Sequence, residues 1–207
     1  MRESAEAKLA RLTRIETDLW AQGARVAGID EVGRGPLAGP VAAACVCISP
    51  QKLVPGVDDS KKLSEKRREA IYPLLLEAAD YVRTAFIAPE VIDEVNILNA
   101  TKMAMEQCAA GFDGLFLVDA VTDLRLPGEA HSIIHGDALS YMIGAASIVA
   151  KVERDRYMLQ LDARYPQYGF ARNKGYGTAE HIAALKAYGP CPAHRRTFIG
   201  RILGGDL

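Results

Sequence analysis

The chain has 207 residues, of which 49% are hydrophobic and 25% charged, and its formal net charge at pH 7 is −1. This length suffices for one domain with a continuous buried core, and the composition is typical of a soluble globular protein. No run of about 18 apolar residues is present, and the N-terminus lacks the apolar core of a signal peptide. The sequence thus predicts no membrane-spanning helix, and we expect a cytoplasmic location.

The cysteines indicate the redox compartment of the protein, and the distribution of charge indicates a candidate binding surface. The four cysteines lack the spacing of a disulfide framework, so we expect free thiols in a reducing compartment. Residues 1–150 hold 15 Lys and Arg against 21 Asp and Glu, whereas residues 151–207 hold 10 against 5. The basic C-terminal part indicates either a phosphate-binding surface beside a metal site or an ordinary solvated face.

Along the chain, the periodicity of apolar residues predicts a single domain of helices and strands. The first element is an amphipathic helix over 3–22, which packs on the outside of the core. Two buried strands follow over 25–31 and 40–48, and the turn between them is so short that they form an antiparallel pair. The later segments are predicted as helices over 65–79 (with a break or kink at Pro73), 89–95, between 101 and 111, 139–164 and 178–188, and as strands over 81–88, 115–119 and 131–135.

Three apolar segments from distant parts of the chain stop on carboxylates, at Asp30 and Glu31, at Asp119 and at Asp137. If these strands lie in one sheet, four carboxylates converge, and they repel one another unless divalent cations hold them. Oxygen-only ligands favour Mg²⁺ or Mn²⁺ over zinc, and paired ions of this kind serve in-line phosphoryl displacement. The alternative is that these acids only mark the points where strands leave the core.

Two glycine-rich loops are candidates for contacts with a ligand. Gly33 and Gly35 flank Arg34 directly after a predicted strand, where bare backbone can approach a ligand closely. Tyr176 lies between two glycines, so its ring can stack on a base or sugar; the alternative is a tyrosine that packs on the surface.

Basic side chains add candidates for contacts with a nucleic-acid backbone. Lys61, Lys62, Lys151 and the basic stretch 194–198 are suited to phosphate binding that weakens with salt. The two aspartates that precede Lys61 alternatively neutralise the first pair of lysines.

Eight segments carry recognisable motifs, follow one another in order and cover most of the chain from about 25 to 199: Gly28–Pro36, Asp59–Ser64, Asn96–Thr101, Val118–Asp119, Ala145–Asp155, Tyr165–Phe170, Lys174–Thr178 and His194–Phe198. Taken together, these segments resemble bacterial ribonuclease HII, a type 2 ribonuclease H. The chain departs from the family pattern at Ala120, where a glycine is common, and at Asn173, where histidine is expected.

The resemblance implies an α/β fold with a ribonuclease H-like central mixed β-sheet, flanking helices and a helical C-terminal part. One domain over 1–207 would then comprise an N-terminal helix (1–23), a catalytic core (25–164) and a substrate-binding part (165–207). It also implies an endoribonuclease that cuts the RNA strand of RNA–DNA hybrids and incises duplex DNA at single embedded ribonucleotides.

The family's known site residues map onto this sequence by position. The turn Gly33-Arg34-Gly35 matches the one that senses the ribose 2′-hydroxyl, and Tyr176 matches the ring that stacks at the RNA–DNA junction. The acids that would hold two Mg²⁺ or Mn²⁺ ions are Asp30, Glu31, Asp119 and Asp137.

Two other function classes stay open at this stage. One is a non-catalytic protein that binds hybrid duplexes by shape and phosphate contact, and the other is a nuclease with the same metal chemistry that acts on DNA. In each case the partner is a nucleic acid, and a monomer is expected.

Overall fold

A mixed five-stranded sheet lies at the centre of the molecule, whose computed structural model describes residues 4–204. The middle strand, β1, pairs antiparallel with β2 and parallel with β4, while β3 and β5 form the two edges. Both types of pairing therefore occur in one sheet, which confirms the predicted α/β fold with a central mixed sheet. The strands are β1 Val26–Val32, β2 Val41–Cys47, β3 Tyr81–Ile87, β4 Leu115–Asp119 and β5 Ala130–Ile133.

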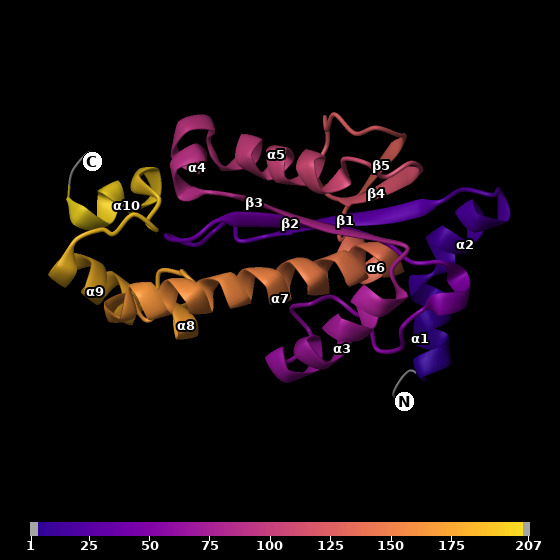
Figure 1. Cartoon of the computed structure of the whole chain (residues 1–207), viewed down its shortest axis with the longest axis horizontal. Helices are drawn as coiled ribbons and strands as arrows, with labels where there is room; N and C mark the ends of the chain where they lie inside the picture. Colours follow the sequence, from indigo (N-terminus) through magenta and orange to yellow (C-terminus); the bar gives the residue numbers. More distant parts are fainter. Residues whose placement is uncertain (1–3, 205–207) are drawn as a thin grey trace.

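Helices cover both faces of the sheet (Figure 1). On one face lie α4 (Pro89–Val95) and α5 (Ile97–Ala109), and on the other lies the long α7 (Tyr141–Arg164). Successive side chains of a strand point to opposite faces, so Ala43 of β2 packs in the core beneath α5 and Ala44 in the core beneath α7. Because both faces are covered, every residue of β2 is buried.

The strand β1 and the helix α7 touch at the level of their backbones. A Cβ placed on Gly28 would lie 2.1 Å from the carbonyl carbon of Met142 and 2.3 Å from Ile143 N, so no other residue fits there without moving the helix. Small residues at the start of α7, such as Ala145 and Ala146, allow the same close approach. The end of β1 and the first turns of α7 are thereby held at a fixed spacing.

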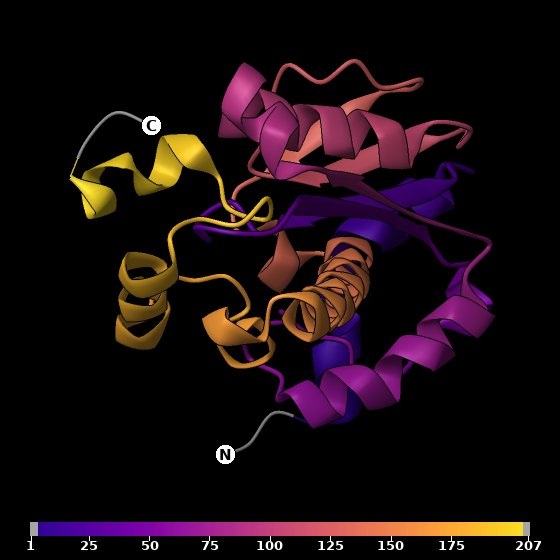
Figure 2. The same cartoon turned by 60° about the vertical axis from the view of Figure 1, so that its left-hand side comes forward.

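The C-terminal part of the chain lies around the C-terminal end of α7, on the left in Figure 1 and turned towards the viewer in Figure 2. Backbone hydrogen bonds connect it to the segment after β1, from Leu37 N to Gly175 O and from Gly39 N to Ala193 O, both at 2.8 Å. Among the helices of residues 4–204, none is long and apolar enough to cross a membrane. The C-terminal elements are the 3-10 helix η2 Pro166–Tyr168 and the helices α8 Phe170–Asn173, α9 Ala179–Tyr188 and α10 Arg196–Leu203.

The helix predicted over 3–22 is in fact two helices, α1 (Ala5–Leu12) and α2 (Arg14–Ala21), and residue 3 lies outside the described residues. The junction is Thr13, whose side-chain hydroxyl donates to Leu9 O at 2.9 Å. A threonine that bonds back to the carbonyl four residues earlier bends a helix, which is why the single-helix prediction was wrong.

Other boundaries also differ from the prediction. The helix α3 (Glu65–Ala78) continues through Pro73 without a break, because Ile71 and Leu75 on either side of the proline are buried in the core. The segment predicted to begin a helix at 139 is split: a short α6 (Gly136–Leu139) ends at Ser140, whose hydroxyl oxygen then caps α7. A 3-10 helix, η1 (Pro50–Lys52), was not predicted.

Candidate active site

Three of the four predicted acids meet where the neighbouring strands β1 and β4 end. In the parallel pair of β1 and β4, Ile29 is opposite Val118, so Asp30 and Asp119 follow side by side. Asp137 is the second residue of α6, which begins shortly after the neighbouring strand β5. One carboxylate oxygen from each of Asp30, Asp119 and Asp137 lies within 4.8 Å of the other two.

Glu31, the fourth predicted acid, follows Asp30 in β1 but does not belong to this group of three oxygens. Its Oε1 is 3.4 Å from Arg34 Nη1. Its Oε2 is buried and has no hydrogen-bond partner among residues 4–204. Glu31 therefore carries a free buried oxygen next to the cluster.

The acid cluster is electrostatically strained. Asp30 is only 5% exposed, and burial followed by the charges of Glu31 and Asp119 raises its pKa well above the usual value. Burial also raises the pKa of Asp119, although a hydrogen bond from Gly136 N at 2.8 Å lowers it in part. Ionised carboxylates this close repel one another, so a nearby positive charge would stabilise them.

A divalent cation is the positive charge that these residues fit. The donors are all carboxylate oxygens, which is the ligand set of Mg²⁺ and Mn²⁺. Within the described residues no other group of three or more His, Cys, Asp and Glu side chains is arranged to hold a metal ion. The unpaired oxygen of Glu31 is a further ligand position next to the group.

Without divalent ions, Asp30 is expected to make the protein less stable as the pH rises. Its pKa is higher in the folded state than the usual 3.8, so its contribution to the free energy of unfolding is present at low pH. That contribution is lost as the pH rises through the raised value, at up to about 1.4 kcal/mol per pH unit. In EDTA at about pH 8, the variant Asp30→Asn should melt several degrees above the parent, at roughly 2–4 °C per kcal/mol.

Thermal denaturation followed by circular dichroism over a range of pH measures this effect. The difference between variant and parent should shrink towards about pH 3, below the usual value of 3.8, where the parent carboxyl is mostly protonated in both states. Equal melting temperatures at about pH 8 in EDTA would show that Asp30 is not strained.

Two buried arginines hold the predicted glycine turn. Arg195 donates to the carbonyl oxygens of Gly33 (2.6 Å), Arg34 (2.9 Å) and Gly39 (2.9 Å). Arg154 of α7 lies beneath Gly33, where a Cβ would come within 2.1 Å of the arginine Nε, and the φ of Gly33 is +91°. The turn therefore keeps its carbonyls engaged inward, which leaves its outer surface as bare backbone.

Tyr176 lies against the same turn. A Cβ on Gly35 would be 3.8 Å from Tyr176 Cε1, and the tyrosine side chain is about half-exposed. The glycine turn and the tyrosine, 141 residues apart in sequence, thus form one surface. The structure brings together what the sequence had identified as two separate loops.

Two buried histidines, His181 and His194, connect the backbone of Cys191 to that of Tyr176 through hydrogen bonds. Cys191 N–H donates to His194 Nδ1 (3.0 Å), so the proton of this imidazole is on Nε2 and is donated to His181 Nε2 (3.0 Å). His181 in turn donates from Nδ1 to Tyr176 O at 2.9 Å. Burial, followed by the proximity of His181, lowers the pKa of His194 to about 4. This ring is therefore neutral at pH 7, as these hydrogen bonds require.

Sequence comparison shows which family has these features. A family model described as Ribonuclease HII matches residues 27–201. A ribonuclease HII of Caldanaerobacter subterraneus subsp. tengcongensis is 47% identical over 194 residues, which cover 92% of this chain and 80% of that protein. The chain belongs to the ribonuclease HII family. It is therefore an endoribonuclease, and the resemblance identified from the motifs is confirmed.

Solved structures show the same architecture. The crystal structure of ribonuclease H2 from Pyrococcus horikoshii OT3 is similar with a TM-score of 0.73 at 26% identity, covering 87% of this chain and 97% of that chain. A chain of the PCNA:RNase HII complex from Archaeoglobus fulgidus gives a TM-score of 0.69 at 26% identity, covering 83% and 93%. The mixed sheet with its flanking helices is thus the fold of the ribonuclease HII family.

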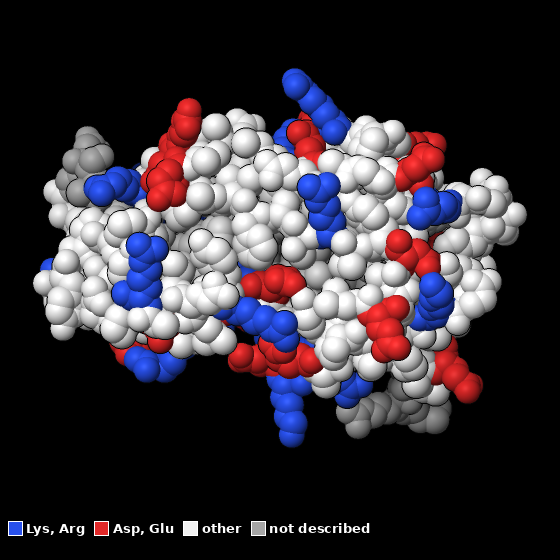
Figure 3. Space-filling view, in the orientation of Figure 1, with Lys and Arg blue, Asp and Glu red and all other residues white. Residues whose placement is uncertain are grey.

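Two of the predicted lysines lie at the surface. Lys61 reaches the acid cluster, where its ammonium is 3.1 Å from Asp137 Oδ2, and Lys62 is 3.7 Å from Asp59. On the face of the molecule in Figure 3, Lys and Arg side chains are interspersed with Asp and Glu side chains. On that face, phosphate binding would depend on individual basic side chains rather than on a broad basic patch.

Lys151 and Arg195 bond to groups inside the protein, whereas Arg196 of the basic stretch 194–198 is exposed. Lys151 is mostly buried, and its ammonium is 2.7 Å from Asp155 Oδ1. Arg195, which belongs to the basic stretch 194–198, is fully buried and donates to the glycine turn, so the prediction that it contacts phosphate was wrong. The physical reason is that the carbonyls of the turn need buried donors, and a guanidinium supplies five in one plane.

The two departures from the family pattern have structural correlates. Ala120 has a positive φ of 49°, a conformation in which glycine is unstrained, and it directly follows Asp119. Asn173 is buried, and its amide donates to Tyr168 O at 2.7 Å and accepts from Gly175 N at 2.8 Å. Asn173 therefore stabilises the loop that carries Tyr176.

Proposed function

We propose that this member of the ribonuclease HII family hydrolyses the RNA strand of RNA–DNA hybrids and incises duplex DNA at single embedded ribonucleotides. The products carry 5′-phosphate and 3′-hydroxyl ends, and the incision begins ribonucleotide excision repair. The observation that supports this proposal is the meeting of Asp30, Asp119 and Asp137 next to a glycine turn. The acids suit phosphodiester hydrolysis, and the turn suits contact with a ribose.

In this proposal the acids hold two divalent ions, Mg²⁺ or Mn²⁺. The chemistry that such ions supply is polarisation of the scissile phosphate and activation of the attacking water. Asp30 and Asp119 belong to rigid, paired strands, so their carboxylates are positioned before substrate arrives. Burial alone would lower the pKa of Lys61, but its hydrogen bond with Asp137 raises it, so the ammonium stays charged beside the phosphate.

The substrate is recognised beside the acids. The outward backbone of Gly33, Arg34 and Gly35 reads the ribose 2′-hydroxyl, which is the group that distinguishes RNA from DNA. Tyr176 stacks at the junction between ribose and deoxyribose. The C-terminal part over 165–207 supplies this tyrosine and Arg195, so it forms the substrate-binding region together with the glycine turn. Lys61 and Lys62 contact the phosphates, and Lys151 contributes only if it leaves Asp155.

The experiment uses three duplexes of one sequence: a hybrid, a DNA duplex with one ribonucleotide and the all-deoxy duplex. We expect the protein with Mg²⁺ or Mn²⁺ to cut the first two, with no cleavage in EDTA and none of the all-deoxy duplex. Binding of hybrids without cleavage under any metal condition would identify a non-catalytic binder. Equal cleavage of the all-deoxy duplex would identify a nuclease that acts on DNA.

Replacing Tyr176 by Ala is expected to reduce selectivity for the single-ribonucleotide duplex. Loss of one stacked ring costs about 1–3 kcal/mol, which corresponds to roughly 5–150-fold in kcat/KM on that substrate. The loss on the long hybrid should be smaller, because many ribose contacts remain. Tyr188→Ala, which removes an exposed ring from α9, is the control. Equal losses on both substrates would argue against the stacking role.

Two further parts of the proposal, the oligomeric state and the location, come from the sequence alone. One is that the chain acts as a monomer, and the other is that it works in the cytoplasm. Light scattering after size exclusion, with and without duplex, measures the first.

A further inference from the structure

The segment that carries Asp137 depends on contacts with the rest of the protein for its conformation. It is the four-residue helix α6, and helices this short are not stable by themselves. The chain enters it through His135, whose φ of 59° is strained for a residue with a Cβ. Such strain persists only where surrounding contacts enforce it. Neighbouring groups must therefore hold α6 in place.

Part of that support comes from within the catalytic core. Gly136 N donates to Asp119 Oδ1 at 2.8 Å, and Ser140 N donates to Gly136 O at 2.8 Å, which closes the turn of α6. Lys61 bonds the carboxylate of Asp137 itself. These contacts fix the start of α6 and the Asp137 carboxylate, but they leave its side facing α1 and α2 to other residues.

The remaining support comes from Glu16 of α2. Glu16 is fully buried, and its Oε1 accepts hydrogen bonds from Ser140 Oγ at 2.5 Å and from Met142 N at 3.0 Å. Ser140 ends α6 and begins α7, so one carboxylate oxygen ties both helices to α2. A negative group at the N-terminus of the 24-residue α7 is also favoured by the helix dipole.

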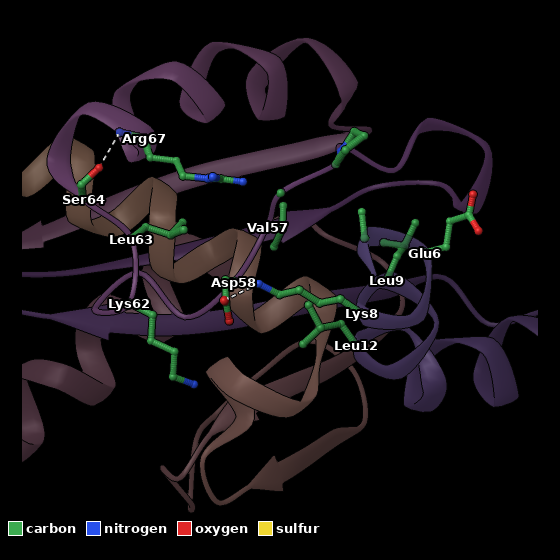
Figure 4. A pocket seen from close by; sticks show the side chains of 13 residues that line it. Glu6, Lys8, Leu9, Leu12, Val57, Asp58, Lys62, Leu63, Ser64 and Arg67 are labelled. Atoms are coloured by element: carbon green, nitrogen blue, oxygen red, sulfur yellow. Dashed lines mark hydrogen bonds and ion pairs between the residues drawn. The ribbon is translucent and has the colours of Figure 1, made fainter. Parts of the chain in front are cut away.

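The preceding helix α1 contacts the same region. Arg11 Nη1 donates to Ala138 O, in α6, at 3.2 Å. Lys8 forms an ion pair with Asp58, three residues before Lys61, at the edge of a cavity of about 780 Å³ between α1 and the loop that leads into α3 (Figure 4). Helices α1 and α2 thus contact both segments that meet at Asp137.

The N-terminal helices lie outside the part of the chain that the family model matches, which begins at residue 27. We propose that Glu16 is a positioning residue for Asp137, and that α1 and α2 hold the α6 side of the acid site in the geometry that binds the metal. This inference rests on the proposed function through the assignment of Asp137 as a metal ligand. It goes further by giving a role to helices that contribute no ligand.

Isothermal titration of the full chain with Mn²⁺, without substrate and well below the melting temperature, tests the proposal. Removing a residue that orients a metal ligand costs about 10–100-fold in metal affinity, so we expect Glu16→Ala to weaken Mn²⁺ binding about tenfold or more. Glu16→Gln should stay within about twofold of the parent, because the amide oxygen can accept both hydrogen bonds. The matched control is Asp18→Ala, which removes an exposed carboxylate from the same helix and should have no effect.

A purely structural role predicts something different, namely a lower melting temperature with unchanged Mn²⁺ affinity of the folded protein. That result for Glu16→Ala would overturn the proposal, as would an equal loss of affinity in the Gln variant. Should Glu16→Ala fail to fold, Ser140→Ala decides: weaker Mn²⁺ binding supports the proposal and unchanged binding overturns it. Asp137→Asn is the reference, because unchanged Mn²⁺ binding in that variant would place the failure in the metal assignment itself.

Discussion

Replacing Asp119 by Asn is expected to lower the rate of cleavage at a single ribonucleotide about a thousandfold. Asp119 belongs to the group of three carboxylates whose oxygens lie within 4.8 Å of one another, and an amide is a much weaker ligand for a hard cation than a carboxylate. The charge stabilisation that a metal supplies is worth several kcal/mol, and about 4 kcal/mol corresponds to a factor of roughly 10³. Single-turnover cleavage with saturating enzyme measures the chemical step.

The matched control for this change is Asp113→Asn. Asp113 is an exposed acid before the opposite end of β4, so the same substitution there should leave the rate unchanged. Melting temperatures of both variants show that the fold is intact. An Asp119→Asn protein that cuts as fast as the parent would exclude the metal mechanism.

Replacing Arg195, which lies buried beneath the glycine turn, by Met is expected to destabilise the protein strongly. The methionine fills much of the space but leaves the carbonyls of Gly33, Arg34 and Gly39 without their donor. Hydrogen bonds from a charged group contribute about 1.5–3 kcal/mol each, so we expect a loss of roughly 4 kcal/mol or more in the free energy of unfolding. For a chain of this size, that lowers the melting temperature by about 8–16 °C.

Denaturant unfolding with the neighbouring variant Arg196→Met as control checks this expectation. Arg196 is exposed and should change the midpoint little. At temperatures where Arg195→Met is folded, a loosened turn should also cut the single-ribonucleotide duplex more slowly. A variant with the stability of the parent would mean that the turn keeps its shape without the guanidinium.

The acids could be predicted from sequence because their signal is local. An apolar run that stops on a carboxylate marks the end of a buried strand, and parallel neighbouring strands of one sheet end side by side. This pattern identified Asp30, Asp119 and Asp137 as candidates before the family resemblance was considered. Asp137 fits the pattern least directly, because the strand before it ends at Ile133 and the acid belongs to the four-residue α6.

The groups that support the site could not be predicted in this way. A guanidinium is rarely fully buried, so Arg154 and Arg195 were counted with the surface charge. Glu16 is four residues after Leu12 and three before Leu19, so it lies on the apolar stripe of the helix, but a glutamate is rarely fully buried and it was not counted with the core. Their positions depend on which carbonyls and amides come close in three dimensions, and no local pattern carries that information.

The backbone contact between β1 and α7 at Gly28 has a consequence for how this protein tolerates change. The distance between most packed helices and strands depends on the side chains that lie between them. It changes when mutations replace those side chains by larger or smaller ones. At Gly28 nothing lies between the strand and Met142 that could vary, so this distance has a hard lower limit. Asp30, on the strand, and Asp137, just before the helix, should therefore keep their spacing when side chains elsewhere in the interior are exchanged.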